Sequence, residues 1–172
     1  MKAVGGLAAL VALGLGLYQL GCEARPDGQE AELRSRGPVQ EAPAPAMEAI
    51  RPEGMAVVPV YSPVIRSNGW LFLSGSVGTV PGGGLVEGGI EAETRQVLEN
   101  VATLLDAAGA GVSDLLRCTV YLADIADYQA MNQIYGAFVA DPPPARTTVA
   151  VAGLPLGARV EVECMARDPG GA

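Results

Sequence analysis

The stretch Pro144-Ala145-Arg146-Thr147-Thr148-Val149-Ala150-Val151 decides the fold, together with Arg159-Val160-Glu161-Val162-Glu163-Cys164. Glu161 of the second stretch lies fifteen residues after Arg146. We expect strands over Ala145–Val151 and Arg159–Ala166, joined through a Gly-Leu-Pro-Leu-Gly loop. This arrangement places one permanent cation and one carboxylate on two neighbouring strands of an otherwise apolar C-terminal half.

Arg146 and Glu161 are the candidate catalytic residues. A guanidinium binds a substrate carboxylate through two parallel hydrogen bonds, and a partly desolvated glutamate can move a proton at neutral pH. The chain contains no histidine, which excludes histidine-based triads and histidine-rich metal sites. On pattern alone, Arg146 could equally pair with an acid across an oligomer interface, and Glu161 with Glu163 could form a solvated charged edge.

The sequence upstream predicts two helices and further strands. We expect strands at Val57–Val60, Val64–Arg66, Trp70–Ser74 and Leu115–Leu122, with a Ser67-Asn68-Gly69 hairpin turn. In the fourth of these, Leu116, Cys118, Val120 and Leu122 should be buried. Apolar spacing predicts a helix over Ile90–Ala108 and a second helix, capped by Asp127, whose stripe comprises Tyr128, Met131, Tyr135 and Phe138.

These elements predict an α+β fold in which two helices cover one face of a mixed sheet. The apolar residues of these elements are enough to form the hydrophobic core of one domain of about 115 residues. The other face of the sheet would be exposed in a single chain, so we expect oligomerisation. The loop Pro81-Gly82-Gly83-Gly84 lacks the features of a phosphate-binding loop and is expected to be a flexible connection.

The N-terminus indicates export. Lys2 precedes a charge-free run that ends at Cys22, as in a bacterial lipoprotein signal with Cys22 as the lipidation site, although Gln19 departs from the usual motif. An uncleaved membrane anchor is the alternative. We therefore divide the chain into a signal segment (1–21), a disordered Pro/Ala/Glu-rich tether (22–54) and a globular domain (55–172), held at the membrane outside the cytoplasm.

The chain is acidic, with 11 Lys+Arg against 19 Asp+Glu and a formal net charge of −8. This net negative charge leaves no excess of Lys and Arg to bind the phosphates of a nucleic acid, so nucleic-acid binding is not expected. Cys118 and Cys164 are expected to be buried free thiols, while a disulfide between them remains open in an exported protein.

The domain resembles the Rid (YjgF) family of enamine/imine deaminases. No single motif is decisive, but the order and spacing of the matching residues are specific together. They are Tyr61-Ser62-Pro63-Val64, Ser74-Gly75, Asn100, Ala107-Ala108-Gly109, Asn132, Tyr135, Pro144–Val149, Leu154-Pro155 and Val160-Glu161-Val162-Glu163. Ser76 and Glu93 stand where the family often has glutamine, which affects the expected pocket shape and substrate range.

The resemblance implies a chorismate-mutase-like fold, a homotrimer and a ligand pocket at the subunit interface. It implies that Arg146 holds a substrate carboxylate, that Glu161 activates water, and that Tyr61, Ser74 and Thr148 contact the substrate. The implied reaction is hydrolysis of 2-aminoacrylate-type enamines and imines to 2-keto acids and ammonia. No cofactor or metal is expected, because a protonated imine is already a strong electrophile.

Two other functions remain open. The domain could be a non-catalytic module that binds a small carboxylate, or an envelope interaction protein. Structural roles also remain open for Ser74, which could cap a turn, and for Tyr61, which could serve in packing.

Overall fold

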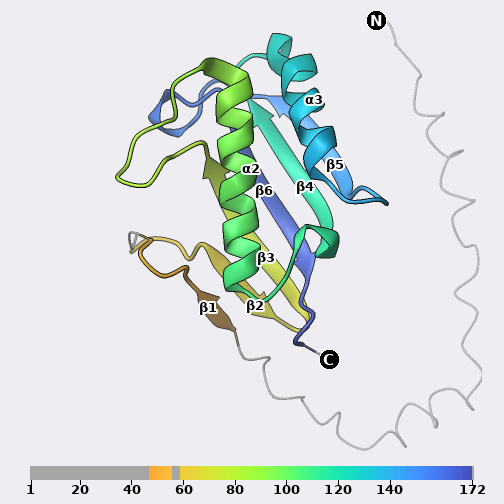
Figure 1. Cartoon of the computed structure of the whole chain (residues 1–172). Helices are drawn as coiled ribbons and strands as arrows, with labels where there is room; N and C mark the ends of the chain where they lie inside the picture. The colour runs from red at the N-terminus through yellow and green to blue at the C-terminus, as the bar shows by residue number, and fades with distance from the viewer. Residues whose placement is uncertain (1–46, 56–58, 172) are drawn as a thin grey trace, which may run out of the picture. The chain divides into compact units, whose positions relative to one another are not determined.

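A single six-stranded sheet, covered on one face by two helices, forms the core of the domain (Figure 1). The computed structural model describes residues 47–55 and 59–171. The strands lie in the order β1-β2-β3-β6-β4-β5, and all neighbours are antiparallel except β4 and β5, which are parallel. The elements are β1 (Glu48–Ile50), β2 (Val64–Ser67), β3 (Trp70–Val77), α2 (Gly89–Ala107), β4 (Leu115–Leu122), α3 (Tyr128–Phe138), β5 (Ala145–Ala150) and β6 (Val160–Arg167). The predicted α+β fold is confirmed.

The hairpin of β2 and β3 forms as the sequence predicts. Ser67 pairs with Trp70 across a two-residue turn. Asn68 and Gly69 both have positive φ, 51° and 78°. Such a turn matches the right-handed twist of the strands, and asparagine and glycine are the residues that tolerate it.

The core lies between the helices and the sheet. Helix α2 buries Val97, Val101 and Leu105 against alternate residues of β3, β4 and β6. Helix α3 adds Met131 and Tyr135, so the predicted apolar stripe is confirmed at its centre. Short 3₁₀ turns at Val112–Asp114, Ile125–Asp127 and Pro155–Gly157 lead into β4, α3 and β6.

Two local predictions are wrong. The pairing of β4 with β6 shifts between Leu115 and Arg117, so Leu115 is buried and Leu116 is 43% exposed. Asp127 makes no side-chain cap on α3, because its carboxylate binds the Arg159 guanidinium through two hydrogen bonds of 3.0 Å. Asp124 instead accepts from the Ala126 N–H and caps the preceding turn.

The folded domain begins earlier than residue 55. Strand β1 pairs with β2, and Glu48 accepts a hydrogen bond of 2.7 Å from Arg66. Pro59 and Val60 lie in a turn, so the strand expected at 57–60 is absent from its described half. The predicted signal segment, Cys22 and most of the predicted tether lie outside the described residues.

Cys118 and Cys164 form a disulfide that links β4 to β6. The two residues are directly opposite in the ladder, and both are buried beneath the helices. The expectation of free thiols is therefore wrong. Cross-strand register brings the two sulfur atoms together, and this register is invisible in the sequence. Among the described residues, neither helix combines the length and apolar character needed to cross a membrane.

Candidate active site

Helix α3 orients the guanidinium of Arg146. Its Nη2 donates to Asn132 Oδ1 at 2.6 Å and to the Tyr128 hydroxyl at 3.2 Å. The guanidinium carbon also lies 4.6 Å from the centre of the Tyr135 ring, which adds a cation–π contact. Within the described residues, no hydrogen bond occupies Nε or Nη1. These two nitrogens therefore remain available as donors to a carboxylate.

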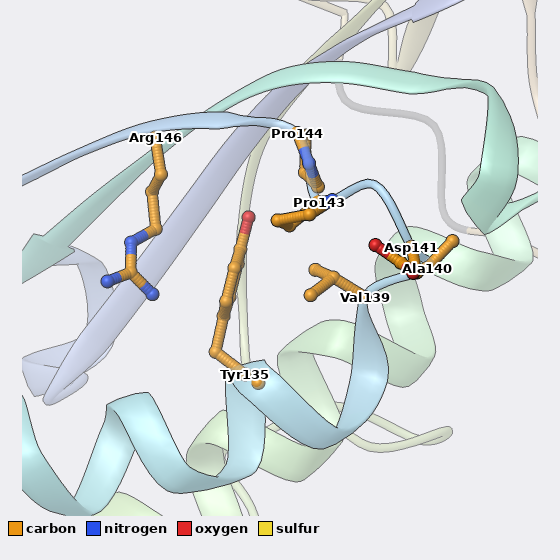
Figure 2. Close-up of a pocket in the computed structure, with 8 residues that line it drawn as sticks. Tyr135, Val139, Ala140, Asp141, Pro143, Pro144 and Arg146 are labelled. Carbon is orange, nitrogen blue, oxygen red and sulfur yellow. The ribbon is translucent and has the colours of Figure 1, made fainter.

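An open pocket of about 540 Å³ adjoins Arg146 (Figure 2). The strand β5 delivers Arg146 to one wall, and Tyr135 rises from α3 beside it. Burial raises the pKa of the Tyr135 hydroxyl, and the charge of Arg146 partly opposes this shift. The remaining wall consists of Gly136 of α3 and of the loop after α3, which supplies Val139, Ala140, Asp141, Pro143 and Pro144.

Glu161 lies on β6 opposite Val77 of β3, and its carboxylate extends to Gly75 of the same strand. A Cβ on residue 75 would overlap Glu161 Oε1, so only glycine leaves room for the carboxylate in this position. The pKa of Glu161 is raised, first by burial and second by the charge of Glu163. A carboxyl group with a raised pKa is suited to both accept and return a proton near neutral pH.

Among the described residues, neither Ser74 nor Tyr61 forms a hydrogen bond with this carboxylate. The pairing of β3 with β6 is interrupted between Leu73 and Ser76, which places Ser74 beside Gly75 in an irregular segment. The Ser74 hydroxyl donates to the Ser62 carbonyl at 2.7 Å, a structural role that leaves its oxygen able to accept. Tyr61 is half exposed and directly precedes Ser62.

Arg146 and Glu161 lie on opposite faces of the sheet. Arg146 is in register with Cys118, which is buried on the helix side. Glu161 alternates with the buried Val160 and Val162 and therefore points to the open side. Strand β4 also lies between β5 and β6. The expectation that the two groups occupy neighbouring strands is wrong, and one chain does not bring them together.

Three further residues belong to the arginine's surroundings. Tyr128, Asn132 and Tyr135 all face Arg146 from α3. Sequence reasoning assigned no site role to them, although their spacing of three or four residues places them on one helix face.

Thr148, two residues beyond Arg146, has a buried Oγ1 without a hydrogen-bond partner in the described structure, which is compatible with the predicted contact to a ligand. In the same described part of the chain, no cluster of acidic or cysteine side chains could hold a metal ion.

Residues 52–168 match the family model described as Endoribonuclease L-PSP. The chain belongs to this family. It is the Rid (YjgF) family that the sequence resembles, so that prediction is confirmed. The Rid-family chain is 44% identical over 107 residues to "Reactive Intermediate Deaminase A, chloroplastic" of Arabidopsis thaliana, covering 62% of this chain and 57% of that protein.

Two other relatives cover more of their own length. The mouse "2-iminobutanoate/2-iminopropanoate deaminase" is 38% identical over 112 residues, which is 64% of this chain and 83% of the mouse protein. The crystal structure of RidA from an Antarctic Psychrobacter species superimposes with a TM-score of 0.66 at 33% identity, covering 70% of this chain and 98% of that one. The fold of the Rid-family chain is thus that of solved RidA.

Proposed function

We propose that this protein hydrolyses small 2-imino acids, and the enamines that tautomerise to them, to 2-keto acids and ammonia. The observation that carries the proposal is the Arg146 guanidinium, which Asn132 and Tyr128 hold beside an open pocket with its Nε and Nη1 donors free. The mouse and Arabidopsis relatives, whose names specify imine and reactive-intermediate deaminases, support the same chemistry.

In the proposed reaction, the free guanidinium donors of Arg146 bind the substrate carboxylate, which orients the imine carbon for attack. Glu161 takes a proton from water as the oxygen bonds to that carbon. It then returns the proton to the amine nitrogen. As the C–N bond breaks and ammonia leaves, the new hydroxyl group gives its proton to Glu161 and becomes the carbonyl of the keto acid. Ser74 and Thr148 would complete the polar contacts, and Tyr61 would close the pocket.

This reaction requires more than one chain, because Arg146 and Glu161 face opposite sides of the sheet. We therefore propose a homotrimer in which each pocket takes Arg146 from one subunit and Glu161 from the next. The open side of the sheet supports assembly, since it exposes large apolar side chains that a partner would cover. They are Trp70, Phe72 and Val149, with Leu116 at the β4 irregularity.

Export and membrane attachment through a lipidated Cys22 remain our proposal for localisation. The disulfide between Cys118 and Cys164 supports export, because such bonds persist in oxidising compartments and are rare in the bacterial cytoplasm. Globomycin treatment of the producing bacterium tests this directly. A lipoprotein would accumulate with its signal segment uncleaved, whereas unchanged processing would contradict lipidation.

The experiment that tests the activity follows loss of 2-iminopropionate. An amino-acid oxidase generates the imine, semicarbazide traps what remains, and the full chain is added in a mild detergent. We expect acceleration by the wild type and a loss of at least about 100-fold in Arg146→Ala, in line with removal of a substrate-orienting group. Arg95→Ala, at an exposed arginine of α2, is the matched control and should retain activity.

A non-catalytic carboxylate-binding module is the second candidate, favoured by the Ser74 hydroxyl being engaged with the Ser62 carbonyl. Calorimetry with pyruvate and 2-oxobutanoate separates the two. Binding that Arg146→Ala abolishes, without imine hydrolysis by the wild type, would favour the module. RNA cleavage, which the family model's description suggests, finds no support in a net charge of −8.

A further inference from the structure

Glu163 and Tyr121 form a hydrogen-bonded pair beside Glu161 on the open side of the sheet. The Tyr121 hydroxyl donates to Glu163 Oε1 at 2.9 Å. Tyr121 stands directly opposite Glu161 in the β4–β6 ladder, while Glu163 is two residues further along β6. The hydroxyl therefore reaches diagonally across the ladder and fixes the second carboxylate on the same face as the first.

No cation separates the two carboxylates within the described chain. Arg159, the nearest arginine along β6, is turned away because its guanidinium binds Asp127 at the start of α3. On the other flank, β3 contributes Gly75, which has no side chain. The titratable groups that face Glu161 are thus Glu163 on its own strand and Tyr121 on β4.

We propose that Glu163, fixed by the Tyr121 hydroxyl, is a positioning residue that keeps Glu161 able to take up and return a proton at neutral pH. The inference rests on the proposed deaminase function and adds two residues to it. Neither residue touches the substrate. Their contribution is a negative charge held at constant distance from the catalytic carboxylate.

The direction of the effect follows from electrostatics. A fixed negative charge disfavours the ionised form of a neighbouring carboxyl group and raises its pKa. The pKa of Glu161 is raised by burial and then by Glu163. The hydrogen bond to Glu163 raises the pKa of the Tyr121 hydroxyl, and burial and the charge of Glu163 add to this shift. Tyr121 thus stays protonated and remains the donor to Glu163.

Activity against pH gives the first readout. The proposed general base must be ionised, so kcat/KM should fall as pH drops through the pKa of Glu161 in the free enzyme. In Glu163→Gln this acid limb should move to lower pH, because the repelling charge is gone. Tyr121→Phe should move it in the same direction by less, because Glu163 is then released toward solvent.

The matched control is Glu99→Gln, which removes one carboxylate from the exposed side of α2. It changes the net charge equally but lies outside the site, so its acid limb should stay with the wild type. A structural role for Glu163 would lower activity equally at all pH values. It would leave the limb in place, and that result would overturn the proposal.

A second readout does not depend on turnover. With ¹³C-labelled glutamate in the full chain, the carboxyl signal of Glu161 is identified by its disappearance in Glu161→Gln. Its titration midpoint should be lower in Glu163→Gln and Tyr121→Phe, and unchanged in Glu99→Gln. An unchanged midpoint in two folded variants refutes the coupling, whatever the activity. A shifted midpoint in a protein that hydrolyses no imine would support the coupling and refute the deaminase function instead.

Discussion

Gly75 is the residue on which the position of the Glu161 carboxylate, the proposed general base, depends most directly. A methyl group there would occupy the space of Glu161 Oε1, whereas the neighbouring backbone is not obstructed. Glu161 is able to rotate away, so the fold should survive Gly75→Ala. The displaced carboxylate, however, should no longer be placed to activate the water. We expect kcat to fall about 10- to 100-fold, the range that misplacement by about 1 Å produces.

Steady-state kinetics on 2-iminopropionate, with thermal unfolding alongside, checks this expectation. Gly153→Ala is the control, because that glycine has negative φ and open space around its Cα. Wild-type kcat in a folded Gly75→Ala protein would mean that the precise location of the Glu161 carboxylate is unimportant for the reaction.

At the scale of elements, the disulfide ties together the two strands whose outward faces carry Glu161, Glu163 and Tyr121. It closes a loop with a sequence separation of 46 residues. Cross-links of this kind contribute about 2–5 kcal/mol in small exported domains. We expect the double variant Cys118→Ala/Cys164→Ala to lose stability within that range, with part of the loss arising from removed core volume.

Urea unfolding of this variant, and of the wild type with and without dithiothreitol, provides the measurement. Dithiothreitol should reach the buried disulfide when the wild type partly unfolds. Reduction of this bond should then lower the urea midpoint of unfolding. Identical midpoints for the oxidised protein and the double variant would show that register and core packing hold β4 to β6 without the cross-link.

The sequence was sufficient for elements with strong periodicity and clear ends. Helix α2 and strands β2, β4, β5 and β6 lie within one residue of their predicted bounds, whereas β3 runs three residues beyond its predicted end at Ser74. Strand β1 was missed, since three residues beside a proline-rich segment carry no period of their own. Its existence depends on tertiary contacts, namely the ladder to β2 and the Arg66–Glu48 ion pair.

The sequence predicted Arg146 and Glu161 as site residues, but neither the helix side chains around Arg146 nor the geometry of the site. The motif around Arg146 and the Val-Glu-Val-Glu run indicate the chemistry that we propose. The face on which Arg146 lies could not be read from its strand, because Thr147, Thr148 and Val149 suit either side of a sheet. Only the register with Cys118 fixes it. The disulfide is invisible for the same reason.

At the scale of the whole molecule, two incomplete half-sites should complement each other. Arg146→Ala and Glu161→Gln should each be inactive as pure proteins. If each pocket combines Arg146 of one subunit with Glu161 of the next, random mixed assemblies should have both groups intact in about a quarter of their pockets.

The test is to mix equal amounts of the two variants under conditions of subunit exchange and to follow imine loss. Recovery near that fraction supports shared pockets. No recovery, with exchange verified by mass spectrometry of differently labelled subunits, would place both groups of each pocket in the same chain. It would therefore contradict the proposed assembly.

Strands β1 and β5 are the two outer strands of the sheet. The described chain enters at β1, while β5, the strand that contains Arg146, lies at the opposite edge of the sheet (Figure 1). An affinity tag joined ahead of Met47 would therefore be attached at the edge of the sheet opposite to Arg146. Coupling the protein to a bead or sensor chip through this tag should leave the pocket beside Arg146 accessible to ligands in solution.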